Sequence, residues 1–155
     1  MSLGAFQATI NETKILKHMG LQVLEASRGR CKLRMPLEGN DNHFSTMHAG
    51  VMYTLAETTG GVLFFATFDV HKYFPLVTEM KIQYRRAATS AVTVEVVMEE
   101  AEIQRLETLV AESGKAAYSW TTKLLDEQGQ VVAVSTNQYQ MRAHGSFKVK
   151  PPSKL

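Results

Sequence analysis

Cysteine is almost absent from this chain, since Cys31 is the only one in 155 residues. A single cysteine excludes an internal disulfide framework and a zinc site made of cysteines. Long apolar runs are also missing: no stretch approaches the roughly 18 residues that span a bilayer, and no charged-then-apolar leader opens the sequence. We therefore expect a soluble protein of a reducing compartment, the cytoplasm by default, with no membrane partner.

An excess of charge of one sign is lacking as well. The chain carries 17 basic and 15 acidic side chains, and it has no basic helix or basic-aromatic alternation, so no nucleic-acid partner is expected. With 45% hydrophobic residues, the chain is long enough for one domain with a proper core. We expect this single domain over residues 1–142, and a disordered tail over residues 143–155, which contain two adjacent prolines and three lysines.

The segment from Met47 to Ala66 is the most apolar part of the sequence. Glu57 is its only acidic residue, and a carboxylate in an apolar helix is costly to bury unless it has partners or a function. Ser45 or Thr46 is expected to cap the start of this helix. Apolar and small residues recur at steps of three and four, which predicts a buried helix through Val51, Met52, Leu55, Thr59, Val62 and Ala66.

Period-two alternation surrounds this helix and predicts strands. Short turns between consecutive strands favour an antiparallel sheet that curls around one apolar helix, an α+β fold. Gly60 and Gly61 each cost about 1 kcal/mol in a helix relative to Ala, so they predict a close approach of another backbone. The expected strands are 21–26, 31–35, 77–85, 91–99, 115–125 and 131–141, with a lead-in helix in 3–18, an irregular stretch at 68–75 and a short helix at 102–113.

A motif lies at the start of the apolar helix: Asn42, Thr46, His48 and Gly50, followed by Glu57 nine positions after the histidine. With the element order, it resembles the hotdog-fold thioesterases, whose antiparallel sheet wraps around a long central helix. The similarity is greatest to the branch with phenylacetate-pathway and hydroxybenzoyl-CoA thioesterases. It covers about residues 20–142, and the helix at 102–113 resembles a poorly characterised subgroup of this superfamily.

The resemblance implies hydrolysis of an acyl-CoA or related thioester, with no cofactor and no metal. Glu57 would act as general base or nucleophile, and Asn42 would hold the attacking water or the Glu57 carboxylate. The Ala49 amide would stabilise negative charge on the substrate, while His48 would position the loop or donate to the substrate. These four residues form the expected catalytic set, and Thr46 and Gly50 are expected to bind substrate.

The chain departs from the family pattern at four places. Ser45 replaces the usual Gly, Ala49 replaces the first Gly of a pair, and Glu57 stands where many relatives carry Asp. Where many relatives have a Ser near the end of the third strand, this chain has Arg85 and Arg86. Guanidinium groups bind phosphate in bidentate fashion, so this pair is expected to contact the CoA phosphates.

Helix geometry separates His48 from Glu57. Nine residues correspond to about 13.5 Å of rise and two and a half turns, so the two side chains face opposite ways and cannot share a site within one chain. If both serve one reaction, two subunits must meet. The hotdog resemblance implies such a homodimer, or a dimer of dimers.

Two other functions stay open at this level. His43 and Glu57 are fourteen positions apart, the separation of His and carboxylate in hotdog dehydratases of hydroxyacyl thioesters, although the Pro-Gly pattern of those enzymes is missing. A non-catalytic acyl-CoA-binding module is the third possibility. The type of acyl chain is left open, with candidate pocket residues Phe44, Tyr53, Phe64, Phe65 and Met52.

Overall fold

The computed structural model describes residues 2–145, which form four helices and six strands. The elements follow one another in the order that the sequence predicted, except that the lead-in helix is split in two. The tail predicted to be disordered falls, from residue 146 on, outside the described residues. The elements are α1 (Leu3–Glu12), α2 (Lys14–Met19), β1 (Gln22–Ser27), β2 (Arg30–Met35), α3 (Ala49–Thr67), β3 (Tyr73–Tyr84), β4 (Val92–Val97), α4 (Glu100–Ser113), β5 (Lys115–Leu125) and β6 (Val131–Ala143).

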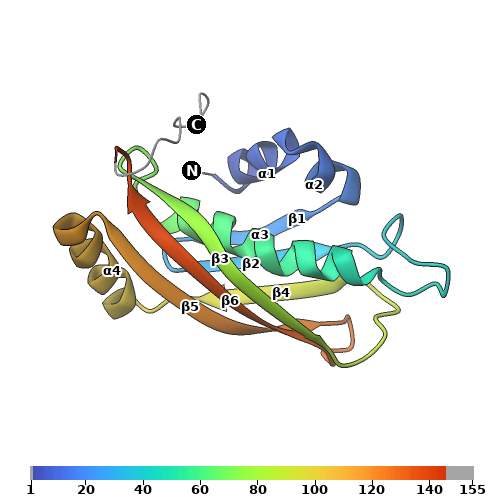
Figure 1. Ribbon diagram of the computed structural model, residues 1–155. Coiled ribbons are helices and arrows are strands. Elements are labelled where there is room, and N and C mark those ends of the chain that lie inside the picture. The colour runs from blue at the N-terminus through green and yellow to red at the C-terminus, as the bar shows by residue number, and fades with distance from the viewer. Residues whose placement is uncertain (1, 146–155) are drawn as a thin grey trace.

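The strands form one antiparallel sheet in the order β1-β2-β4-β5-β6-β3. Figure 1 shows the sheet curving around α3, with α1 and α2 on the other side of that helix and α4 beside β5 at one end. The predicted α+β arrangement, an antiparallel sheet wrapped around one long helix, is confirmed. Two strands, β1 and β3, are left at the edges of the sheet.

The core lies between the concave face of the sheet and α3. Cys31, Leu33 and Met35 of β2 point inward and are completely buried, as their alternation predicted. Burial raises the pKa of the Cys31 thiol to about 12, so this cysteine is an inert, small apolar residue. Leu55 and Ala56 of α3 are equally buried on the helix side of the core.

The lead-in segment forms two helices because the chain turns at Thr13. Thr13 has extended backbone angles (φ −80°, ψ 102°), and its N–H closes α1 on the Ile10 carbonyl while its carbonyl accepts from Lys17 at the start of α2. Gly20 ends α2 in the left-handed conformation, which glycine adopts readily. The single helix expected over residues 3–18 is therefore wrong.

Strand β3 begins at Tyr73, inside the stretch expected to be irregular. Pro75 is part of the strand and lies opposite Met141 of β6. A proline lacks the N–H of a ladder bond, but β3 is an edge strand with a partner on one side only, where proline is tolerated. The edge position explains why the strand extends through the proline. It cannot be read from the local sequence.

Gly60 and Gly61 have different surroundings, although they are adjacent. A Cβ at Gly60 would lie closer than 3.0 Å to the ring of Tyr139, whose side chain extends from β6 to α3. Tyr139 is buried, stacks on Trp120, and donates its hydroxyl to the Glu57 carbonyl at 3.3 Å. The expected contact between two backbones is thus wrong: an aromatic ring approaches the helix at Gly60, and a Cβ at Gly61 would have no neighbour within 4 Å.

Candidate active site

The start of α3 is capped by His48. Its Nδ1 accepts a hydrogen bond from the Gly50 N–H at 3.0 Å, so in the neutral ring the proton is on Nε2. A Cβ at Gly50 would lie 3.1 Å from the ring atoms Cε1 and Nδ1 of His48. Glycine at this position therefore leaves room for the histidine cap.

The prediction that Ser45 or Thr46 caps a helix starting at Met47 is wrong. Met47 is still extended, because it forms a β-bridge with Asp41 and its N–H donates to the Ala88 carbonyl at 2.8 Å. Ser45 has a positive φ of 58°, a conformation in which glycine is the usual residue. The serine that replaces the family's glycine thus keeps a glycine-like backbone.

The Ala49 N–H is a free donor at the first position of α3. No acceptor for it is found within residues 2–145, and the residue is exposed. The first amides of a helix carry the positive end of the helix dipole, and α3 is 19 residues long. The hydroxyl of Tyr84, at the end of β3, donates to the Ala49 carbonyl at 2.8 Å. The local sequence carries no signal for this contact of Tyr84, because the contact depends on the curvature of the sheet.

Asn42 and Thr46 come together in the loop before the helix. The Asn42 Nδ2 donates to the Thr46 Oγ1 at 3.1 Å, and its Oδ1 accepts from the N–H groups of Phe44 and Thr46 at 2.9 and 3.3 Å. The asparagine side chain therefore holds the loop in shape. No hydrogen bond joins it to Glu57 within the described chain.

Glu57 lies on the opposite side of α3 from His48, half-buried among apolar side chains. Burial raises the pKa of its carboxyl above the ordinary value of 4.5, as expected for a carboxylate removed from water. In the part of the chain that the structure describes, the carboxylate has no hydrogen bond and no ion pair; the bond from Tyr139 goes to its backbone carbonyl. A desolvated carboxylate without a partner makes Glu57 a candidate catalytic group.

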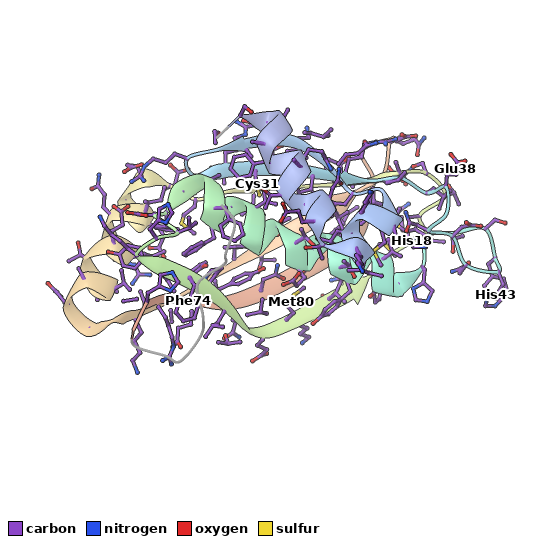
Figure 2. The ribbon with its side chains drawn as sticks, turned by 90° about the horizontal axis from the view of Figure 1, so that it is seen from above. His18, Cys31, Glu38, His43, Phe74 and Met80 are labelled. Atoms are coloured by element: carbon purple, nitrogen blue, oxygen red, sulfur yellow. The ribbon has the colours of Figure 1, made fainter. Side chains whose placement is uncertain are left out.

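A cavity of about 270 Å³ lies between α1 and α2 on one side and α3 on the other, and Glu57 is part of its wall. Figure 2 shows α1 and α2 lying across α3 in the view from above. Phe65 lines this cavity, as the sequence had suggested. The residues that line it come from three helices: Phe6, Thr9, Ile10, Thr13, Leu16, Glu57, Thr58, Gly61, Val62 and Phe65.

The other aromatic and methionine candidates lie elsewhere. Phe64 and Met52 are buried in the core, while Phe44 is 74% exposed and Tyr53 is 39% exposed. The contribution of the lead-in segment to the cavity was not predicted. Its apolar residues, spaced as on one face of a helix, were a signal that this face packs against another part of the chain.

Arg85 and Arg86 follow directly on β3 and are exposed. Their guanidinium groups bond to the side-chain oxygens of Gln83 and Gln130, each at 2.7 Å, and form no ion pair with a carboxylate of the described residues. Because the preceding Tyr84 contacts Ala49, both arginines lie at the same end of the molecule as the start of α3. The fold therefore brings them toward His48 and not toward Glu57 of the same chain.

His43 lies at the outer end of the loop before α3 (Figure 2), with its ring 4.0 Å from that of Phe44. It is exposed and does not meet Glu57. Residues 2–145 contain no cluster of three or more His, Cys, Asp or Glu side chains placed to hold a metal ion. None of the helices described here is both long and apolar enough to cross a membrane.

The chain is similar to known proteins in sequence and in architecture. Residues 9–141 match the model of the family called domain of unknown function DUF4442. None of the curated proteins matches the chain significantly. A match over this share of the chain makes it a member of that family.

Solved structures show the same arrangement of elements. A Pseudomonas aeruginosa protein of unknown function, described as a probable thioesterase, is 39% identical over 93% of this chain and 97% of its own, with a TM-score of 0.89. A thioesterase from Haemophilus influenzae is 15% identical over 92% of each chain, with a TM-score of 0.72. A mutant thioesterase from Pseudomonas aeruginosa is 16% identical over 92% of this chain and 95% of its own, with a TM-score of 0.73. The chain therefore belongs to the DUF4442 family and has the hotdog fold of the thioesterase superfamily.

Proposed function

We propose that the protein hydrolyses an acyl-CoA thioester at a site shared by two copies of the chain. The observation that carries this proposal is Glu57, a half-buried carboxylate of raised pKa that has no partner within residues 2–145 and faces a cavity. A purely structural carboxylate in this position would be expected to have donors around it. The description of the 39% identical relative as a probable thioesterase supports the same chemistry.

The reaction needs a base, a site for negative charge and a leaving thiol. The ionised Glu57 takes a proton from water while the water oxygen bonds to the thioester carbonyl carbon. The C=O electron pair moves to oxygen, and the free N–H of Ala49 from the second copy stabilises that oxyanion at the positive end of α3. When the C=O re-forms, the C–S bond breaks, and the leaving thiolate takes the proton from Glu57. Direct attack by the carboxylate, followed by hydrolysis of the anhydride, would give the same acid and CoA.

Two copies are needed because the oxyanion site and the base lie on opposite sides of one helix. The separation between the helix start and Glu57 corresponds to about 13.5 Å of rise along α3. Strand β3 is a sheet edge that pairs only with β6 in the described chain, and its Val77 and Tyr84 are 43% and 45% exposed. An unpaired edge is a ready route to a symmetric dimer. A stable monomer near 17.3 kDa in light scattering would contradict this arrangement.

The loop before α3 has a positioning role in this proposal. Asn42 and Thr46 hold the loop through their mutual hydrogen bonds, and His48 caps the helix through Nδ1. Gly50 leaves room for that imidazole. The Nε2–H of His48 is then directed away from the helix amides and serves as a donor to the thioester or to the CoA portion.

Arg85 and Arg86 supply the positive charge for the CoA phosphates. They are exposed, have no carboxylate partner among the described residues, and lie at the end of the molecule where α3 begins. Replacing both with Ala is expected to raise KM for acyl-CoA about tenfold and to leave small thioesters without a nucleotide nearly unaffected, because only the phosphate contacts are lost. Equal losses on both kinds of substrate would show that the pair supports the fold or the chemistry instead.

The experiment that tests the function is release of free thiol from a panel of short, medium, long and aromatic acyl-CoA substrates. We expect kcat/KM to fall as the pH drops through the raised pKa of Glu57, because the base must be ionised. Tight binding of acyl-CoA without turnover would favour a non-catalytic acyl-binding module. A protein that neither binds nor hydrolyses any acyl-CoA of the panel would contradict the proposal.

A further inference from the structure

We infer that the cavity between α1, α2 and α3 is the acyl-chain pocket, and that the two N-terminal helices form its roof and limit the chain to medium length. The inference rests on the proposed thioester hydrolysis and adds its substrate class: a linear alkyl acyl group of up to roughly eight carbons. The reacting carbonyl lies beside Glu57, and the alkyl chain extends from there under the roof.

The lining of the cavity suits an alkyl chain better than water. Phe6, Ile10 and Leu16 close it from the roof, and Val62 and Phe65 close it from α3. A buried water requires two to four polar partners, whereas an alkyl group gains from contact with apolar walls. The cavity therefore favours an apolar occupant.

The threonines of the lining do not change this character. The Thr58 hydroxyl donates to the Thr54 carbonyl at 2.8 Å, and the Thr9 hydroxyl donates to the Ala5 carbonyl at 3.1 Å. Both hydroxyls are thus satisfied within their own helices, and the third threonine of the lining, Thr13, is exposed at the turn between α1 and α2. Glu57 is the one ionisable residue among those that line the cavity. A single ionisable group in a largely apolar pocket is the arrangement that orients a ligand with one polar end.

The size of the cavity sets the length of the chain. The cavity of about 270 Å³ has room for an alkyl chain of several carbons, and its extent along α3 sets how far such a chain can reach. Glu57, Gly61 and Phe65 follow one another along the same face of α3, over about 12 Å of helix rise. A chain that starts at the carboxylate can therefore lie along the helix as far as the Phe65 ring.

The roof is fixed to the rest of the domain. The Gln7 side chain bridges α1 to the start of β1: its Nε2 donates to the Leu21 carbonyl at 2.9 Å, and its Oε1 accepts from the Val23 N–H at 2.8 Å. Gly61 forms the floor, and a Cβ there would meet nothing within 4 Å. The open space over Gly61 belongs to the cavity, so a larger side chain at this position would occupy the pocket without displacing the core.

Gly61→Leu is the decisive variant, and Gly4→Leu is its matched control. Gly4 is exposed on α1, outside the cavity lining, and also has no neighbour within 4 Å of a Cβ. The measurement is the ratio of kcat/KM for octanoyl-CoA to that for butanoyl-CoA. We expect Gly61→Leu to lower this ratio at least tenfold, since one surplus methylene in a filled pocket costs about 10- to 200-fold. Gly4→Leu should keep the wild-type ratio.

A change that enlarges the cavity should lengthen the acyl chain that the protein accepts. Phe65 is half-buried at the far end of the cavity, and Phe65→Ala is expected to move the preferred substrate two to four carbons upward. A Gly61→Leu protein that hydrolyses octanoyl-CoA with the wild-type ratio would overturn the pocket assignment and leave the thioesterase proposal standing.

The pocket assignment can be tested even if the thioesterase proposal is wrong. If no acyl-CoA is hydrolysed, calorimetry with S-alkyl-CoA thioethers, which cannot be cleaved, still tests the pocket. Affinity that rises with alkyl length to about eight carbons in the wild type, and stops rising at shorter chains in Gly61→Leu, would support the assignment. Three results would overturn it: an affinity that does not depend on alkyl length, an affinity that stops rising at the same alkyl length in both proteins, or no binding at all.

Discussion

The two faces of α3 differ most clearly at two adjacent glycines. At Gly60 the helix meets the Tyr139 ring so closely that a Cβ has no room, whereas at Gly61 a Cβ would meet empty space. The first face is closed by the sheet and held by hydrogen bonds from Tyr139 and Asn137 to the carbonyls of Glu57 and Ala56, the latter at 3.0 Å. The second face carries the Glu57 carboxylate and borders the cavity. One face of the helix packs against the sheet, and the other borders open space.

The strongest test of this difference is Glu57→Gln on the open face. If the carboxylate is the base, activity on acyl-CoA should fall by roughly 100- to 10,000-fold, the usual contribution of a general base. The fold should survive, because an amide is cheaper to bury than an ionised carboxylate without a partner. Thiol release and thermal unfolding measured on the same protein separate the two effects.

Glu112→Gln on the exposed surface of α4 makes the same chemical change away from the cavity and is the control. It should retain wild-type activity. A Glu57→Gln protein that is stable and fully active would mean that the open face carries no base.

Gly60→Ala tests the closed face. The new methyl group would press on a Tyr139 ring that stacks on Trp120 and is hydrogen-bonded through its hydroxyl, so the ring cannot move aside easily. Overpacking of this kind costs about 1–3 kcal/mol, and the better helix propensity of alanine returns at most about 1 kcal/mol. Denaturant unfolding should show a net loss of stability; an unchanged midpoint would mean that the closed face can adjust.

Gly61→Ala is the matched change on the open face and should have the opposite sign. Nothing obstructs its Cβ, so the gain in helix propensity of about 0.5–1 kcal/mol should appear in the free energy of unfolding. Unfolding of the two alanine variants under identical conditions compares the faces directly. Destabilisation of Gly61→Ala similar to that of Gly60→Ala would remove the difference between them.

The smallest expected effect is on the pH dependence of stability. Burial raises the folded-state pKa of Glu57 above 4.5, so between these two values the folded protein binds more protons than the unfolded chain. By linkage, the contribution of Glu57 to stability falls as the pH rises from 4.5 through the raised pKa. Glu57→Gln lacks this loss, so its stability relative to wild type should increase across that window. Parallel stability curves for the two proteins would show that Glu57 is well solvated.

Much of the fold could be read from residue spacing because burial in strands and helices follows a simple period. Cys31, Leu33 and Met35 alternate along the sequence, and they are buried in the structure. The apolar spacing around Glu57 also predicted a desolvated carboxylate, and its raised pKa agrees. These features depend on neighbours within one element, which the local sequence contains.

The element boundaries and contacts that were predicted incorrectly depend on residues far apart in the chain. His48, and not Ser45 or Thr46, caps α3 because Met47 is held extended by Ala88, forty-one positions away. β3 tolerates Pro75 because the strand lies at an edge of the sheet. No local pattern reports either condition.

The α+β class, the apolar helix and the isolated acid within it could be predicted from residue spacing, because each follows from local periodicity and from the cost of burying charge. The contact of Gly60 with a ring and the open space at Gly61 arise from the packing of distant segments. The same packing places α1 and α2 over the cavity beside Glu57 and brings Arg85 near the start of α3. The physical reason is that open space and close approach arise where distant segments pack, and residue spacing within a single element does not describe them.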